Sequence, residues 1–430
     1  MQTVQHTADA KPRSRLPSFL RQAGPGIVTG AADDDPSGIA TYTQAGAQFG
    51  TGILWTVFLT LPFMIAVQLV SARIGRQSGK GIVANLKTKT RPAFVYTIVA
   101  LLLLANTINI AADIAAMGAA VQLVVGGSPQ LHALLFGVAT VLLQVLVPYR
   151  RLAPVLKWLT LSLFVYVGAS FAVDIPWRQV LRDLVVPTFV PSSAFWMTLV
   201  AILGTTISPY LFFWQASQEV EELQQQGIRP RREKVRHIYQ AIRRLRIDTV
   251  VGMVFSNAIA FFVMLMGAVV LHAAGHHEVA SAAEAAEALR PLAGDLAFSL
   301  FAVGIVTTGM LAVPVLASSA AYAVAEVFGW PEGLERHWRE ARGFYGIVVL
   351  ATLAGTLLGF TPINPMKALV WAAVVNGVVA VPILAVMMML AADPKVMGPL
   401  VVRRRTRALG WGAVGLMGAA VVMMGHDLLQ

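Results

Sequence analysis

Long apolar segments alternate with short polar or basic ones along almost the whole chain. The first twenty residues are polar and basic, and the apolar segments that follow each have close to the roughly 20 residues with which a helix crosses a bilayer. This pattern predicts an all-α polytopic membrane protein. We expect about eleven membrane-spanning helices, near residues 24–50, 52–72, 94–125, 131–148, 153–173, 194–217, 247–273, 294–328, 343–360, 364–391 and 408–425.

Two of these segments are interrupted at membrane depth. Residues 33–38 of the first read Asp-Asp-Asp-Pro-Ser-Gly, and residues 205–210 of the sixth read Thr-Thr-Ile-Ser-Pro-Tyr. Exposed backbone polar groups and carboxylates are costly in hydrocarbon, so a broken helix persists only where the break faces protein or a wet cavity. Such breaks commonly hold an ion or a solute. The pattern therefore favours a transporter.

The two breaks occupy matching places in consecutive units of five spans, 1–5 and 6–10. Matched breaks indicate an inverted repeat, in which the unwound stretches of the two first helices meet near the bilayer midplane. We expect the following division: a cytoplasmic tail at 1–23, repeat one at 24–173, repeat two at 174–391 with a cytoplasmic loop at 218–246, and a last part at 392–430 with span eleven.

Basic residues orient the array. The tail and the segments after even-numbered spans, including Lys157 at the start of span five, hold 29 of the 33 Lys and Arg residues, and the exceptions are Arg178, Arg182, Arg290 and Lys367. This asymmetry predicts a multi-pass protein of the cell (inner) membrane with a cytoplasmic N-terminus and an external C-terminus. The composition agrees, since 57% of residues are hydrophobic, 13% are charged and the mean hydropathy is +0.67. Loops that face anionic lipid explain the net charge of +11, so the expected partner is the lipid bilayer and not nucleic acid.

The side chains at the breaks narrow the cargo. Asp35, directly before Pro36, is the best candidate for a charged ligand, and Gly38 lets the backbone unwind and expose carbonyl oxygens. The sixth span adds hydroxyls and carbonyls that Pro209 frees, because proline cannot donate to the helix ladder. Neither break contains Cys, His or Met, and hard oxygen donors suit Mg²⁺, Ca²⁺ or Mn²⁺. The candidate ligands are Asp35, Gly38, Thr205 and Ser208, with Thr206 beside them.

At these positions the sequence resembles a known family. Residues 35–41 (Asp-Pro-Ser-Gly-Ile-Ala-Thr) and 44–50 (Gln-Ala-Gly-Ala-Gln-Phe-Gly) look like the first helix of the Nramp divalent-metal transporters, whose motif reads Asp-Pro-Gly-Asn. Residues 112–115 and 118–120 match that family's third helix. The span count and the repeat extend the resemblance to nearly the whole chain. It implies a LeuT-like fold and alternating access for divalent metal ions.

Departures from the family pattern are informative. Gly38 stands where the family has a metal-binding asparagine, and Ser208-Pro209-Tyr210 stands for Met-Pro-His. Gln215 replaces a second histidine, and Ala116 replaces an acidic residue. Loss of the methionine sulfur removes discrimination against Mg²⁺, and a larger polar pocket suits an ion that keeps its waters. The pattern is similar to the Nramp-related magnesium transporters, a branch that carries Mg²⁺ and Mn²⁺ without proton coupling.

Further polar residues have expected roles in a second shell or a vestibule. Asp113 in span three is a second-shell acid or a residual proton site. Asp33 and Asp34 either attract cations in the cytoplasmic vestibule or merely lie in its water-filled mouth. Asn376 either reaches the ion or forms a helix-to-helix hydrogen bond. The full set is Asp34, Thr206, Tyr210, Gln215, Asp113 and Asn376.

Three other functions compete with this interpretation. A proton-coupled Mn²⁺ or Fe²⁺ importer is the runner-up. A sodium-coupled amino-acid transporter shares the repeat, but Asp35 is poorly placed for a substrate carboxylate. An intramembrane aspartyl protease would need two paired carboxylates, and the one Gly-Asp sequence, at 294–295, has no Tyr-Asp partner. We therefore expect no enzyme, no cofactor and no obligate protein partner, with Mg²⁺ or Mn²⁺ as the transported substrate.

Overall fold

The computed structural model of the protein describes residues 25–147, 160–228, 235–398 and 401–429, and the single positions 151 and 230. In these residues every regular element is a helix. The unbroken long helices are α4 (Trp55–Ser78), α6 (Pro92–Val125), α7 (Pro129–Leu146), α13 (Val235–Met266), α16 (Ala297–Phe328), α17 (Arg342–Leu358), α18 (Pro365–Ala392) and α20 (Arg404–Leu428). Two pairs are continuous except for a short break: α2 (Pro25–Asp33) with α3 (Pro36–Phe49), and α11 (Ser193–Thr206) with α12 (Pro209–Gln225). The short segments are η1 (Gly50–Ile53), α5 (Ile82–Leu86), η2 (Thr160–Leu163), α9 (Phe164–Ser170), α10 (Trp177–Val185), η4 (Gly267–His272), α14 (Ala282–Glu287), α15 (Arg290–Ala293), η5 (Gly294–Leu296) and α19 (Pro394–Met397).

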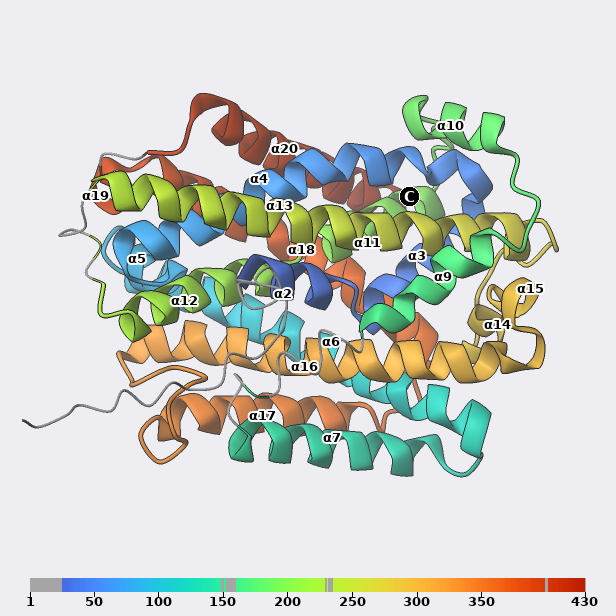
Figure 1. The fold of residues 1–430 in the computed structure, drawn as a ribbon, viewed down its shortest axis with the longest axis horizontal. Helices are drawn as coiled ribbons and strands as arrows, with labels where there is room; N and C mark the ends of the chain where they lie inside the picture. Colours follow the sequence, from blue (N-terminus) through green and yellow to red (C-terminus); the bar gives the residue numbers. More distant parts are fainter. Residues whose placement is uncertain are drawn as a thin grey trace, which may run out of the picture.

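Most long helices run side by side along the longest axis of the molecule (Figure 1). In that view α4, α13 and α20 lie along the upper edge and α7 and α17 along the lower edge, with α2, α3, α6 and α18 between them. Helix α6 packs against α16, α7, α17 and α18, while α13 packs against α2. The broken helices therefore lie inside a bundle of unbroken ones.

Length and hydropathy agree with the expected spans. In the described part, eight helices are long and apolar enough to cross a membrane. Two further expected spans are the broken first helix and the 17-residue α17. The fifth is described only from Thr160 onward, so residues 153–159 of that prediction lie outside the described residues, as does the tail at 1–23.

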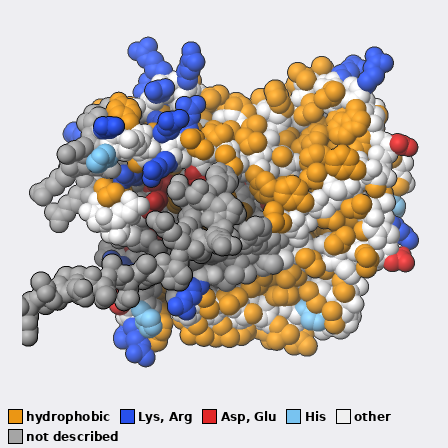
Figure 2. All heavy atoms as spheres, viewed as in Figure 1, with side chains coloured by type: hydrophobic (Ala, Val, Ile, Leu, Met, Phe, Trp, Pro, Cys, Tyr) orange, Lys and Arg blue, Asp and Glu red, His pale blue; other side chains and the backbone are white. Residues whose placement is uncertain are grey.

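The outer surface has the character of a lipid-facing protein. Apolar side chains cover the long sides of the molecule, and Lys and Arg gather at the end where Figure 1 places α5 and α19 (Figure 2). Large apolar residues on peripheral helices are exposed, among them Leu142 at 51%, Leu350 at 63% and Val422 at 69%. Such a surface exceeds what a soluble monomer exposes and suits hydrocarbon. We call the end formed by α5 and α19 the basic end.

The first break lies where the sequence predicts it. Helix α2 ends at Asp33 and α3 begins at Pro36, which cannot donate to the helix ladder. Asp35 has extended backbone angles (φ −70°, ψ 169°) and caps α3, because its Oδ1 accepts the N–H of Gly38 at 2.7 Å. Proline at the first helical position and an acidic cap thus start a new helix within the membrane-length segment.

The second break also lies in its predicted place. Helix α11 ends at Thr206, Ile207 leaves the helical region (φ −122°, ψ 57°), and α12 begins at Pro209. Ser208 precedes that proline with an extended backbone, as is typical of the residue before proline. The two breaks are confirmed.

Helices on both sides of the expected loop at 218–246 extend beyond the expected spans. Helix α12 continues to Gln225 and α13 begins at Val235, so most of the described part of this loop is helical. Residue 229 and residues 231–234 lie outside the described residues. The extension has a physical basis at Glu219 and Glu221, which are only 5% and 8% exposed and therefore belong to the packed bundle.

Helix α2 lies very close to α13. A Cβ atom at Gly30 would lie 2.2 Å from the backbone oxygen of Gly252, so only glycine permits this approach. The backbone N–H of Gly26 donates to Asp248 Oδ2 at 2.6 Å one turn earlier. These contacts fix the half-helix that leads into the first break.

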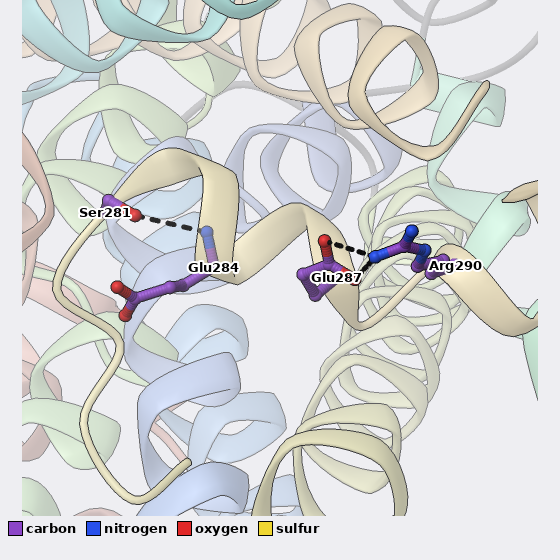
Figure 3. A network of polar contacts seen from close by, with 4 residues as sticks. All are labelled: Ser281, Glu284, Glu287 and Arg290. Carbon is purple, nitrogen blue, oxygen red and sulfur yellow. Dashed lines mark hydrogen bonds and ion pairs between the residues drawn. The ribbon is translucent and has the colours of Figure 1, made fainter. Parts of the chain in front are cut away.

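Short helices connect η4 to α16 at the end opposite the basic end (Figure 1). Ser281 begins α14, since its hydroxyl accepts the N–H of Glu284 at 3.2 Å (Figure 3). Glu287 and Arg290 form an exposed ion pair at 3.0 Å, which contributes at most about 1 kcal/mol. The segment is therefore ordered mainly by its cap and its packing.

Candidate functional site

Asp35 is the centre of the candidate site. Its Oδ1 accepts hydrogen bonds from the Ser37 hydroxyl at 2.7 Å and the Gly38 N–H at 2.7 Å. Its Oδ2 accepts from Asn109 Nδ2 at 3.1 Å and from the Tyr210 hydroxyl at 3.3 Å. The side chain is 1% exposed. Donors from α3, α6 and α12 thus hold one carboxylate in a fixed orientation deep in the bundle.

The α11–α12 break lies directly beside this carboxylate. The Tyr210 hydroxyl also donates to the carbonyl oxygen of Ala32, at 2.9 Å, and so joins α12 to the end of α2. A Cβ atom at Gly38 would lie 3.0 Å from Thr205 Oγ1 and 3.4 Å from Asp35 Oδ1. That Thr205 hydroxyl is buried beside the Tyr42 side chain and forms no hydrogen bond of standard geometry with the described residues. Asp35, Gly38 and Thr205 are therefore neighbours, as expected for one site.

Ser208 and Thr206 differ from Thr205. The Ser208 hydroxyl donates to the carbonyl oxygens of Gly204 at 2.8 Å and Thr205 at 2.7 Å, and it does not cap α12. The Thr206 hydroxyl donates to Ile202 O at 2.8 Å within its own helix. A donating hydroxyl keeps its lone pairs, so Ser208 remains able to face a cation. Its position at the break is observed, while its role as a ligand stays a prediction.

Asp113 lies one helical turn after Asn109 on α6, and residues four apart share a helix face. Because Asn109 contacts Asp35, this face of α6 lines the site. Asp113 is fully buried; the backbone N–H of Ser37 interacts with its carboxylate, but neither oxygen accepts a hydrogen bond of standard geometry from the described residues. A carboxylate in this state attracts a cation, water or a proton.

Asn376 and Gln215, two residues expected in the second shell, lie on α18 and α12. Asn376 of α18 is 1% exposed, and neither of its amide atoms has a partner in the part of the chain that the structure describes. The helix-to-helix hydrogen bond considered for it is therefore absent from the described residues. Gln215 donates to Thr249 Oγ1 at 3.0 Å, so it joins α12 to α13 instead of bonding to Asp35.

Asp33 and Asp34 are buried and do not line an open mouth. They are 1% and 2% exposed, and both lie against the Ser256 hydroxyl of α13, at 2.6 Å from Asp33 Oδ2 and 3.1 Å from Asp34 Oδ1. Because α2 packs tightly on α13, both carboxylates are enclosed between these two helices, and the role of Asp34 in attracting cations stays a prediction. With Asp35 and Asp113 they form a set of four buried carboxylates.

Sequence reasoning missed three residues whose side chains contact these carboxylates, Ser37, Asn109 and Ser256. A signal existed for Asn109, since an amide four positions before a membrane-depth aspartate on an otherwise apolar helix shares its face. No sequence signal indicated the contact of Ser256, because a single serine in a long apolar helix commonly forms a hydrogen bond with its own backbone.

Replacing Asn109 with leucine, which has a similar size, is expected to weaken the metal transport that the sequence pattern predicts. The change removes one of the two hydrogen bonds to Asp35 Oδ2. A hydrogen bond to a charged group is worth about 1.5–3 kcal/mol, so the KM for metal uptake should rise roughly 10- to 150-fold. Uptake into proteoliposomes measures this, with Thr107→Val as the control because the Thr107 hydroxyl donates to Leu103 O of the same helix. An unchanged KM would remove Asn109 from the site.

These features define a class of protein. The fold is a bundle of apolar helices in which two broken helices meet at a buried, hydrogen-bonded carboxylate, as in membrane transporters that bind a solute at paired helix breaks. Comparison with known proteins then gives the family. A family model described as natural resistance-associated macrophage protein-like (Nramp) matches residues 26–426, so the chain belongs to the Nramp family, a family of multi-pass membrane transporters and not of enzymes.

Individual relatives agree with this assignment. The divalent metal cation transporter MntH of Klebsiella pneumoniae is 28% identical over 411 residues, covering 93% of this chain and 92% of that protein. The crystal structure of a mutant manganese transporter from Eremococcus coleocola has a TM-score of 0.73 at 16% identity and covers 94% of this chain and 85% of that one. Mhp1, a nucleobase-cation-symport-1 family transporter solved in a closed conformation, has a TM-score of 0.51 at 13% identity and covers 94% of this chain and 93% of that one. The expected LeuT-like fold with two five-helix repeats is confirmed.

Proposed function

We propose that the protein transports divalent metal cations, with Mg²⁺ as the main substrate and Mn²⁺ as a second one, by alternating access without proton coupling. The observation that carries this proposal is the Asp35 carboxylate, buried where the two broken helices meet and held by donors from three helices. A fixed carboxylate of this kind is suited to bind a cation and not an anionic or amino-acid substrate.

The donor chemistry supports Mg²⁺. We assign Asp35, Gly38, Thr205 and Ser208 as ligands, of which Gly38 contributes through its backbone. All of their donor atoms are oxygens, and no sulfur lies in either break. Oxygen-only sites suit Mg²⁺ and Mn²⁺, whereas thioether and thiolate ligands favour softer ions. The names of the relatives, a divalent metal cation transporter and a manganese transporter, support the broader class.

The runner-up function is a proton-coupled Mn²⁺ or Fe²⁺ importer. One observation favours it: Asp33, Asp34, Asp35 and Asp113 are all buried, and one divalent cation neutralises only two of these four carboxylates. Buried charges without partners bind protons. Proton coupling also requires that these protons leave and return during each transport cycle. The family uses two histidines for this, and this chain has Tyr210 and Gln215 at those positions.

We propose that the basic end faces the cytoplasm of a bacterial inner membrane, which places the N-terminus inside and the C-terminus outside. The gathering of Lys and Arg at this end supports the orientation (Figure 2). An inward-negative potential then favours uptake of a divalent ion by about 4.6 kcal/mol per 100 mV.

Metal uptake into proteoliposomes should follow the gradient of the metal alone. With Mg²⁺, Mn²⁺ or Ca²⁺ outside, a clamped negative potential and a pH dye inside, we expect Mg²⁺ and Mn²⁺ to enter without a change of internal pH. Asp113→Asn should then leave the dye signal flat as well. Acidification in proportion to metal uptake that disappears in Asp113→Asn would establish proton coupling and refute this part of the proposal.

A further inference from the structure

A cavity of about 360 Å³ lies at the basic end, between α4, α5 and α19. None of the residues that line it belongs to either helix break. Segments more than 300 residues apart in sequence form its walls. Three of the residues that line it are lysines, Lys80, Lys89 and Lys395, and Ser78, Asn85 and Thr88 supply polar side chains. At a share of roughly 30 Å³ per water, its volume corresponds to about a dozen water molecules.

The wall formed by residues 78–85 has a defined structure. Gly79 has a positive φ of 64° and ends α4, which turns the chain sharply. The Asn85 amide donates to Ser78 Oγ at 2.8 Å, Lys80 O at 3.0 Å and Gly81 O at 2.8 Å. These bonds hold the Lys80 backbone in place, so the Lys80 side chain extends from a rigid turn.

The opposite wall is joined to the first by an ion pair. Lys89 Nζ lies 2.5 Å from Asp393 Oδ2, and Asp393 Oδ1 accepts the N–H of Lys395 at 2.7 Å to cap α19. The hydrogen bond from Lys89 lowers the pKa of Asp393, so this carboxylate is ionised at neutral pH. Asp393 therefore forms an ion pair with Lys89, and its charge also acts on Lys395, so one carboxylate serves two of the three lysines.

Lys80 and Lys395 have no ion-pair partner in the part of the chain that the structure describes. Both line one polar cavity, and two like charges that share a cavity are stabilised by an anion between them. Lysine binds phosphate as a point charge with three donors, and basic pockets at the cytoplasmic side of membrane proteins bind phosphorylated lipid headgroups.

We propose that the cavity lined by Lys80, Lys89 and Lys395 binds a phosphate-bearing anion. A phospholipid headgroup or soluble phosphate could supply the same chemistry. A bound phosphate would join the turn after α4 to α19, two segments that the Lys89–Asp393 pair already links, and would stabilise the folded protein by mass action.

Thermal unfolding of the purified full-length protein at low salt tests the proposal. Two probes are titrated: inorganic phosphate, and short-chain phosphatidylglycerol against phosphatidylcholine in the same micelles. We expect Tm to rise with a phosphate-bearing anion but not with phosphatidylcholine. In Lys80→Gln/Lys395→Gln the apparent affinity should fall roughly 30-fold, on the basis of about fivefold per lysine near an anionic group.

The matched control is Arg182→Gln/Lys367→Gln, which removes the same charge from exposed positions outside the cavity. It should keep the wild-type response. A response to phosphatidylglycerol alone identifies a lipid headgroup, and a response to both probes identifies phosphate itself. Equal losses in the two double variants, or no response of the wild type to either anion, would overturn the proposal.

The single variant Lys395→Gln, checked for normal metal uptake, replaces the double variant if the double variant does not fold. Because binding is measured without transport, failure here leaves the proposed function untouched.

Discussion

Asp35→Ala is expected to abolish Mg²⁺ and Mn²⁺ uptake while the protein stays folded in the membrane. The substitution removes the one carboxylate that lies at the meeting of both helix breaks and is hydrogen-bonded to Ser37, Gly38, Asn109 and Tyr210. Loss of a charged ligand should reduce uptake at least 100-fold, because charged hydrogen-bonded partners at buried sites contribute about 3–5 kcal/mol.

Two measurements separate a site effect from misfolding. Asp35→Asn keeps the size of the side chain, so it should lose transport with little change in Tm. Asp295→Ala, in an exposed position at η5, should transport as the wild type does. Wild-type uptake by Asp35→Ala would show that the metal binds elsewhere.

Gly38→Asn combined with Ser208→Met is expected to shift the metal preference from Mg²⁺ toward Cd²⁺. The double variant restores the asparagine and the methionine of the family pattern, and a thioether favours soft ions. The structure adds a steric reason: the new Cβ at residue 38 would lie 3.0 Å from Thr205 Oγ1, so that hydroxyl must move. Inhibition of Mn²⁺ uptake by Mg²⁺ and by Cd²⁺ gives the ranking, and we expect the ratio of the two inhibition constants to change at least tenfold.

Gly38→Ala is the control for crowding in this experiment. It adds the same Cβ beside Thr205 but no metal ligand. It should weaken uptake of all three ions alike, while only the double variant should change their order. If the double variant keeps the wild-type order, Ser208 and Gly38 do not set the metal range.

Local signals predicted the two helix breaks well. Pro36 and Pro209 lack the N–H that a continuous helix needs, and Asp35 caps the helix that follows. These effects act within one helical turn, so they can be read from neighbouring residues. The expected spans were located by the same kind of local pattern, although their ends shifted, as α13 shows by starting at Val235.

Contacts of the candidate site could be predicted only in part. Asp35, Gly38 and Thr205 lie together because two breaks at matching places of a repeat meet, which sequence spacing indicates. The contacts of Asn109 with Asp35 and of Gln215 with Thr249 depend on the rotation of α6 and α12 about their axes. No local pattern specifies such a rotation when nearly every face of a helix is apolar.

By itself the sequence determined the class of protein, the positions of the breaks and the absence of Cys, His and Met from them, because hydropathy, proline and side-chain chemistry are properties of short segments. Only the tertiary structure decided that Asp33 and Asp34 are buried against Ser256, and that Lys80 and Lys395 line one cavity. Each of these pairings joins residues more than 200 positions apart. The physical reason is that such contacts follow from how closely helices pack, as where Gly30 meets Gly252, and packing is a property of the whole bundle.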